Sequence, residues 1–152
     1  MRKRTRSREF ALQILYQIDM THGTAAEVLE DFWEDKSDVA LTPKEKESLE
    51  EYKKDPDIRR YAETLVGGVL GKLETVDKLI ERFAENWEMK RMAYVDRNIL
   101  RLSTFEMLYL DDIPLKVAIN EAVELAKRYG ESDSSKFVNG ILDRIAKTEC
   151  KK

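Results

Sequence analysis

Apolar side chains recur every three or four residues along most of this chain, which is the spacing that places them on one face of an α-helix. One such stripe runs from Val95 to Tyr109. The 152 residues include only 6 Gly and 3 Pro, and no stretch alternates apolar and polar residues for long enough to predict a strand. The sequence therefore predicts an all-α fold: a single compact bundle of six to seven helices, in one domain over residues 1–152.

Turn and capping signals divide this pattern into helices. The expected helices are one over about residues 5–20, one beginning after Thr24, a long one over 57–87 that bends near Gly71 or Glu74, and three over about 95–110, 114–129 and 134 onward. Residues 37–57 are rich in charge and contain Pro43 and Pro56. They are expected to form an irregular acidic connection, either mobile or partly helical.

Charge is distributed unevenly along the chain. The net charge is −3, which alone would argue against a nucleic-acid partner. Residues 1–8, called here the basic arm, nevertheless contain no acidic residue and five basic ones: Arg2, Lys3, Arg4, Arg6 and Arg8. Over residues 27–57, by contrast, acidic side chains outnumber basic ones by roughly two to one. The asymmetry, rather than the sum, points to a charged partner for the arm.

Residues able to carry catalysis or hold a metal are scarce. His22 is the only histidine and Cys150 the only cysteine, and no motif ties a nucleophile or an orienting carboxylate to His22. Gly67, Gly68 and Gly71 precede Lys72 as in a phosphate-binding loop, but Leu73 follows instead of Ser or Thr, within a helical stripe. Small residues at this spacing are better explained by close helix packing. We expect no active site, no metal and no cofactor.

The cellular compartment follows from the same composition. A single cysteine cannot form an internal disulfide, which favours a reducing compartment. No apolar run reaches the roughly 18 residues of a membrane span, and the basic arm leads into an amphipathic stretch rather than the apolar core of a signal peptide. The sequence predicts a cytoplasmic protein.

The arm contains the strongest signal for binding. Clustered guanidinium groups bind phosphates, and they stack on unpaired bases, which suits single-stranded RNA. The alternative is a disordered solubilising tail, and the arm alone does not decide between the two. Tyr16 lies two helical turns beyond Arg8 and could share the face of the arm. Phe137, beside Lys136 in the first turn of the last helix, is a further candidate, with core packing as its alternative.

Four segments resemble one known family. They are KVAINEAVELAKRYG (Lys116–Gly130), SSKFVNGILD (Ser134–Asp143), VDRNILRLSTFEML (Val95–Leu108) and RSREFALQILYQID (Arg6–Asp19). Together they resemble the NusB family of bacterial transcription antitermination factors, and the resemblance covers nearly the whole chain outside residues 37–57. The KFVNG and INEA-ELAK motifs are specific in combination and much weaker singly.

The resemblance implies a function that composition could not supply. NusB proteins are all-helical, and they bind the boxA element of ribosomal RNA operon leaders together with NusE, which is also a small-subunit ribosomal protein. The complex joins an antitermination assembly on RNA polymerase, so that polymerase reads through terminators. The family includes both monomers and homodimers, and the sequence does not choose between them.

The resemblance also implies roles for individual residues. The implied RNA-binding residues are Arg4, Arg6, Arg8, Tyr16, Asp133, Lys136 and Phe137. Asp96 stands at the position of an acidic contact to NusE. The alternative function is a helical protein-binding adaptor that makes no direct RNA contact and whose arm meets an acidic partner. RNA methyltransferases with a NusB-like domain also exist, but they need an additional nucleotide-binding α/β domain, and no glycine-rich strand–helix unit occurs in this sequence.

Overall fold

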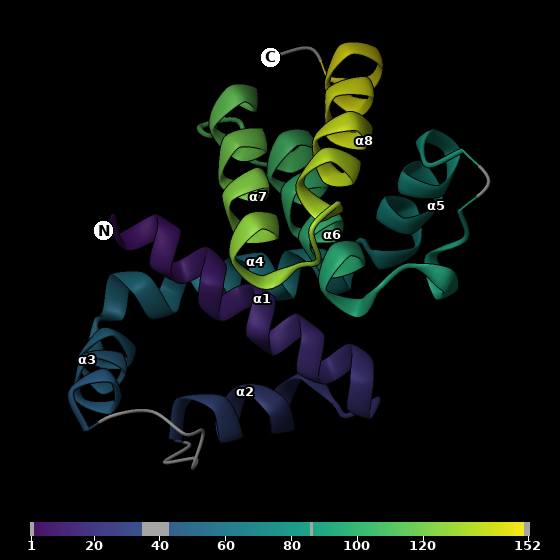
Figure 1. The fold of residues 1–152 in the computed structure, drawn as a ribbon. Helices are drawn as coiled ribbons and strands as arrows, with labels where there is room; N and C mark the ends of the chain where they lie inside the picture. Colours follow the sequence, from purple (N-terminus) through teal and green to yellow (C-terminus); the bar gives the residue numbers. More distant parts are fainter. Residues whose placement is uncertain (1, 35–42, 86, 151–152) are drawn as a thin grey trace. The chain divides into compact units, whose positions relative to one another are not determined.

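The computed structural model describes residues 2–34, 43–85 and 87–150, and these residues form helices joined by short connections, with no strand among them (Figure 1). This confirms the all-α prediction. Backbone contacts group the chain into two compact units, unit 1 (Met1–Thr64) and unit 2 (Leu65–Lys152), with the boundary inside one helix. The organisation of the chain as one domain stays a prediction.

Unit 1 begins with α1 (Lys3–Thr21) and α2 (Ala25–Glu34), which fold against each other (Figure 1). His22 ends α1 in the left-handed conformation (φ 58°) and donates its backbone N–H to the Ile18 carbonyl over 2.8 Å. Thr24 then caps α2, as predicted, because its hydroxyl accepts the Glu27 backbone N–H over 3.2 Å. The ring of Phe10 packs edge-on against Phe32 at 5.4 Å between centroids, which joins the two helices.

Unit 1 continues with α3 (Pro43–Lys54) and the first turns of α4 (Pro56–Gly71). Residues 43–54 form a helix, which bears out the partly helical alternative for 37–57 rather than the mobile one, while residues 37–42 lie outside the described part of the chain. Pro43 is the first residue of α3, where a proline costs no hydrogen bond. Asp55 caps α4 by accepting the backbone N–H of Asp57 over 2.9 Å.

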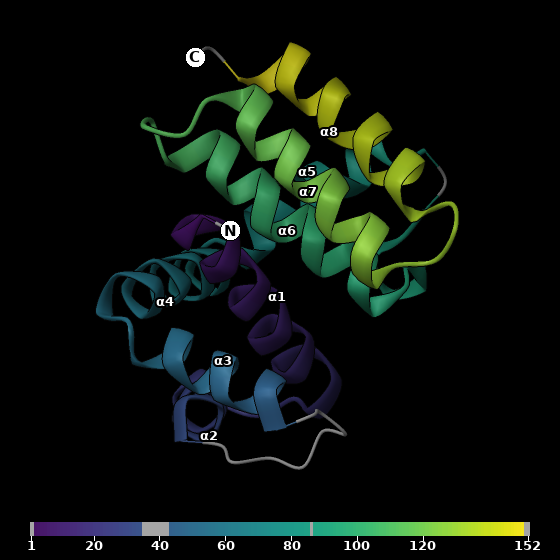
Figure 2. The ribbon, with the colours of Figure 1, turned by 60° about the vertical axis from the view of Figure 1, so that its left-hand side comes forward.

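Unit 2 consists of the end of α4, then α5 (Leu73–Phe83), the 3₁₀ turn η1 (Met89–Arg91), α6 (Tyr94–Tyr109), α7 (Leu115–Tyr129) and α8 (Ser134–Glu149). Helices α6, α7 and α8 lie side by side, and α5 packs on α6 and α8 (Figure 2). Their facing stripes are fully buried: Val76, Ile80, Ile99, Leu102, Leu125, Ile141, Leu142 and Ile145. Among the described residues there are thus eight α-helices rather than six or seven, because α3 was expected only as part of a partly helical connection and the 57–87 helix is two.

The close helix packing predicted for the glycines holds at one of the three. A Cβ atom on Gly68 would lie 2.0 Å from Cζ of Phe105, so α4 approaches α6 only because this position has no side chain. A Cβ on Gly67 or Gly71 would meet nothing within 4 Å, and the prediction is wrong for these two. Gly71 instead ends α4, where the bend was predicted.

Candidate RNA interface

The basic arm is part of a regular helix in this structure. Helix α1 begins at Lys3, with no acidic residue in its first turn and no side chain capping it. Cations are unfavourable there, because the free N–H groups already make this end of a helix positive. The disordered-tail interpretation is therefore wrong for residues 3–8, and the first turns of α1 concentrate positive charge at the expense of helix stability.

Two carboxylates at the start of α4 anchor the arm. The Lys3 ammonium lies 3.1 Å from Asp55 Oδ2 and 3.2 Å from Asp57 Oδ2. Hydrogen bonds to Asp55, then to Asp57, raise the pKa of Lys3, and the hydrogen bond from Lys3 lowers the pKa of Asp55. The Ser7 hydroxyl adds a buried link, donating to the Ile58 carbonyl over 2.8 Å. The arm is thus fixed to α4 within unit 1.

The three predicted arginines of the arm differ in exposure and share aromatic neighbours. Arg4 is exposed and its Cζ lies 4.6 Å from the Tyr61 ring centroid. Arg6 lies 4.5 Å above the Tyr52 ring, and Arg8, only 2% exposed, lies 5.7 Å from the Tyr61 ring. Of the three, Arg4 therefore presents its guanidinium most openly to a ligand, and Arg8 lies beneath as support.

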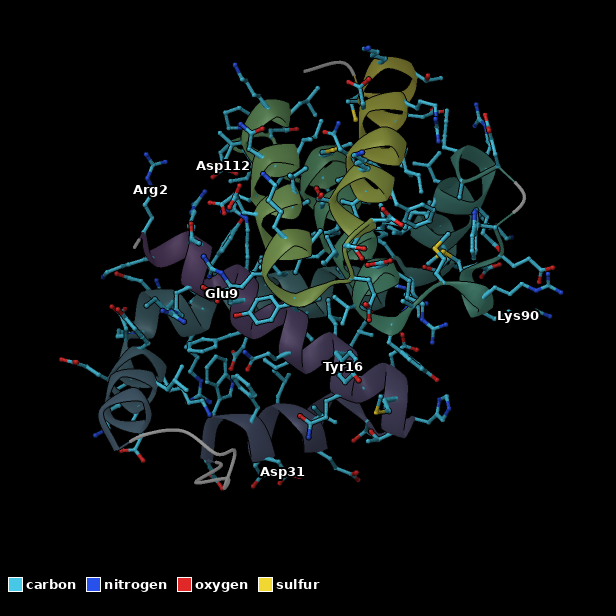
Figure 3. All side chains as sticks on the ribbon, viewed as in Figure 1. Arg2, Glu9, Tyr16, Asp31, Lys90 and Asp112 are labelled. Atoms are coloured by element: carbon cyan, nitrogen blue, oxygen red, sulfur yellow. The ribbon has the colours of Figure 1, made fainter. Side chains whose placement is uncertain are left out.

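Tyr16 lies well away from the arm along the same helix. Figure 3 shows Arg2 at the N-terminal end of α1, with Tyr16 toward its other end. At 1.5 Å of rise per residue, Tyr16 lies about 18 Å along the helix axis from Arg4 and about 12 Å from Arg8. Its side chain is half-buried. A ligand that touches both Arg4 and Tyr16 must therefore be extended, as a single strand of several nucleotides is.

A second cluster of predicted residues lines a pocket in unit 2, the aromatic–acidic pocket. Its volume is about 280 Å³, and its lining residues are Trp87, Arg91, Met92, Ala93, Asp96, Glu131, Asp133, Ser134 and Phe137. Phe137 packs edge-on against Trp87 at 5.9 Å between centroids. Oδ1 of Asp96 is buried without a hydrogen-bond partner. Two residues predicted for RNA and the one predicted for the protein partner thus meet in one pocket, whereas Lys136, exposed on α8, is outside its lining.

Local hydrogen bonds shape the walls of this pocket. The buried Arg97 guanidinium donates to the Met89 carbonyl over 3.0 Å, which ties η1 to the start of α6. Glu81 accepts the Met89 backbone N–H over 3.0 Å and so holds η1 from the other side. At the opposite wall, the Ser134 hydroxyl accepts the Glu131 backbone N–H over 2.9 Å before α8 begins. Hydrogen bonds within the chain therefore hold both walls of the pocket.

The described part of the chain contains no group of three or more His, Cys, Asp or Glu side chains placed to hold a metal ion. In the same residues, no helix combines the length and the apolar character that a membrane crossing requires.

Comparison with known proteins decides the family. Residues 5–147 match the sequence profile of the NusB family. The chain belongs to the NusB family. A relative from Myxococcus xanthus, described as transcription antitermination protein NusB, is 47% identical over 146 residues, which cover 96% of each chain. The resemblance noted in the sequence is thereby confirmed.

Solved structures of NusB proteins share this fold. T. maritima NusB is 37% identical and superimposes with a TM-score of 0.79, covering 97% of this chain and 93% of its own. A chain from a crystal structure of the antitermination factors NusB and NusE in complex with dsRNA is 29% identical, with a TM-score of 0.79, and covers 97% of this chain and 98% of its own. The all-helical architecture is therefore that of NusB over nearly the whole length.

Two aromatic residues of the site in this NusB-family chain were not predicted. Tyr61 lies within the helix expected over 57–87 and was not predicted as a site residue, yet it lies beside Arg4 and Arg8. Trp87 follows the end of the same stripe and is 49% exposed. A signal existed for Trp87, because a large aromatic beyond the last apolar turn, followed by charged residues, has no core position to fill. No such signal existed for Tyr61, whose role depends on a distant helix.

Proposed function

We propose that this chain is a transcription antitermination factor that binds boxA-type single-stranded RNA of ribosomal RNA operon leaders together with a NusE-type protein. The match to a NusB protein crystallised with NusE and dsRNA, over 97% of this chain, is the observation that supports this most directly. The complex would act on RNA polymerase during read-through of terminators, in the cytoplasm. The role is one of binding, with no catalytic step.

The positive end of α1 supports RNA binding by the arm. Free N–H groups at a helix N-terminus attract anions, and four basic residues follow within the first two turns: Lys3, Arg4, Arg6 and Arg8. A chain whose net charge is −3 gains nothing in solubility from this arrangement. Natural proteins commonly break a local stability rule where function requires it. We assign the exposed Arg4 to a phosphate, with Arg6, the buried Arg8 and Tyr16 completing the surface in unit 1.

The aromatic–acidic pocket supports a second set of contacts. Phe137 and the exposed Trp87 offer ring faces on which an unpaired base stacks. Asp133, exposed at the start of α8, would accept a hydrogen bond from a base amino group. Lys136 on the neighbouring turn would meet the backbone phosphates.

The NusE-type partner would meet the same pocket through Asp96. Its buried carboxylate oxygen has no hydrogen-bond partner within the described chain, and burying an unpartnered carboxylate oxygen is costly. A lysine or arginine from the partner would satisfy it.

The experiment that tests the proposal is filter binding of a boxA RNA, with and without NusE, over a salt series. We expect binding by the chain alone, tighter binding with NusE, and a linear fall of log affinity with log salt. A scrambled RNA of the same length and a duplex of the same sequence are the controls. Equal affinity for boxA and scrambled RNA would contradict boxA recognition, and tighter binding of the duplex would contradict the single-stranded assignment.

A second candidate, a protein-binding adaptor without direct RNA contact, is favoured by one observation. The pocket places two rings beside the carboxylates of Asp96 and Asp133, which also suits a cationic side chain of a protein. The salt series separates the two candidates, because this one predicts NusE binding but no RNA binding. Sedimentation at several concentrations would show whether the chain is a monomer or a homodimer.

A further inference from the structure

A groove lies between α1 and α4, and of the residues that line it only Arg4 belongs to the predicted RNA site. Its volume is about 370 Å³, and it is lined by Lys3, Arg4 and Ser7 from α1 and by Asp57, Arg60, Tyr61 and Thr64 from α4. All seven residues belong to unit 1. A volume of this size is in the range of pockets that hold small organic molecules, so it accommodates part of a nucleotide.

The charge of the groove favours a polyanion. Three of its side chains are cationic, Lys3, Arg4 and Arg60, whereas Asp57 is its only carboxylate. Lys3, at 3.2 Å, and Arg60, at 3.6 Å, both lie within ion-pair distance of Asp57. The Arg60 side chain is nonetheless 76% exposed, so its guanidinium can turn to a phosphate at little cost.

The polar and aromatic groups of the groove suit the sugar–phosphate backbone better than an apolar ligand. The Ser7 hydroxyl donates to the Ile58 carbonyl over 2.8 Å, and the Thr64 hydroxyl donates to the Arg60 carbonyl over 2.9 Å. The Thr64 side chain is exposed, so its oxygen can still accept a hydrogen bond, for example from a ribose hydroxyl, whereas Ser7 is fully buried and only joins α1 to α4. The Tyr61 ring lies 4.6 Å from the Arg4 guanidinium and limits the directions in which Arg4 can point.

We propose that α4 forms the second wall of the RNA site, with Arg60 binding a backbone phosphate and Tyr61 acting as a positioning residue for Arg4. The inference rests on the proposed function, because it names further residues that bind the same RNA. The groove is continuous with the basic arm, and its cationic side chains complement backbone phosphates. We therefore choose RNA over other occupants. An acidic peptide is the competing ligand, and the test below distinguishes it.

The first test removes the Arg60 charge. Arg60→Ala should weaken binding of a short single-stranded boxA-type RNA about threefold to tenfold at low salt, and reduce the slope of log affinity against log salt by about 0.7. Arg59→Ala is the matched control: it removes the same charge one residue earlier on α4, from a side chain that is 52% exposed, pairs with Glu63 and does not line the groove. The control should change the affinity less than twofold.

The second test concerns Tyr61. Tyr61→Leu should weaken RNA binding about twofold to fivefold, because it removes the ring beside Arg4, whereas Tyr61→Phe should retain wild-type affinity. A merely structural role for Tyr61 would lower the melting temperature without this rescue pattern in RNA affinity. If Tyr61→Leu does not fold, the Arg60 and Arg59 pair decides the question alone.

The outcomes separate this inference from the proposed function. No RNA binding by the wild-type chain at any salt would overturn the proposed function and this inference with it. Normal wild-type binding, with equal effects of Arg60→Ala and Arg59→Ala, would overturn this inference alone. Binding of polyglutamate by the wild type but not by Arg60→Ala, with equal RNA affinity in the two proteins, would identify an acidic-peptide site and would also overturn it.

Discussion

The arginine guanidinium groups of the basic arm lie 4.5 to 5.7 Å from the ring centroids of Tyr52 and Tyr61. In the aromatic–acidic pocket, the rings of Trp87 and Phe137 pack against each other, 5.9 Å apart, with Asp96 in the same lining. The arm therefore uses aromatic side chains to hold cations in place, whereas the pocket leaves aromatic faces and carboxylates to the ligand.

This difference has a measurable consequence for binding. Contacts between arginine and phosphate release counterions, so their contribution falls as salt rises. Stacking on a ring depends on contact area and changes little with salt. If both regions bind one RNA, changes in the arm should alter the salt dependence of affinity, and changes in the pocket should alter affinity at every salt concentration alike.

The largest expected effect comes from the pocket. Phe137→Ala should cost about 1–3 kcal/mol of RNA affinity, because it removes a stacking surface, and should leave the salt slope unchanged. Anisotropy titrations across a salt series, with thermal unfolding alongside, measure both quantities. Tyr129→Ala, which removes an exposed ring (39%) from α7 outside the pocket, is the control. A folded Phe137→Ala protein with intact RNA affinity but lower stability would mean that Phe137 is only a packing residue.

The next effect comes from the arm. Arg4→Glu should weaken RNA binding about tenfold at low salt, or about 1.4 kcal/mol, and should flatten the salt slope. Arg59→Glu, a reversal of charge outside the groove, should have a much smaller effect on both. The contrast between the two regions breaks down if Arg4→Glu lowers affinity equally at all salt concentrations.

A smaller effect is expected at two acidic residues of the pocket, Asp96, which we assign to the protein partner, and Asp133, which we assign to RNA. Asp96→Asn keeps the shape of the side chain but removes its charge, so binding of a NusE-type partner should weaken about fivefold, or about 1 kcal/mol. RNA affinity in the absence of the partner should be unchanged. Asp133→Asn is the counterpart and should lower RNA affinity but not partner affinity. Identical profiles for the two variants would show that the pocket has one ligand rather than two.

Most of the fold could be predicted because its signals are local. The α6 stripe from Val95 to Tyr109, the stop at Gly130 and the Thr24 cap all depend on residues within a few positions of one another. The bounds of α3, and its regularity, could not be predicted in this way. Its sequence is highly charged and lacks a clear apolar stripe, and Pro43 was interpreted as a breaker although it is the first helical residue.

The candidate site was only partly predictable because it depends on contacts between distant segments. The cationic character of Arg4 is visible in the sequence, but its aromatic neighbour Tyr61 comes from another helix. The burial of Arg8 could not be predicted either, because five of the first eight residues are basic and nothing in the sequence distinguishes the buried one from the exposed ones. Gly68 shows the same limit: three glycines had the same local signal, and only tertiary packing against Phe105 distinguishes one of them.

The smallest expected effect concerns the anchoring of the arm by Lys3 and Asp55. The pKa of Asp55 is lowered in the folded chain, so the carboxylate favours folding above its unfolded pKa of about 3.9, and this contribution is lost as pH falls through the folded value. The pKa of Lys3 is raised, so its contribution is complete below about pH 10.4 and is lost only as pH rises through the higher folded value. Lys3 is exposed and the Asp55 side chain is partly exposed (25%), so solvent screens the pair and the change in stability should be slight.

Urea unfolding between about pH 2 and 7 should show a slightly flatter acid limb for Asp55→Asn than for wild type, with Asp112→Asn, a surface change on the α6–α7 connection, as the control. Superimposable acid limbs for wild type and Asp55→Asn would mean that the ion pair does not hold the arm in place, and the arm would then owe its order to the Ser7 hydrogen bond and the aromatic contacts alone.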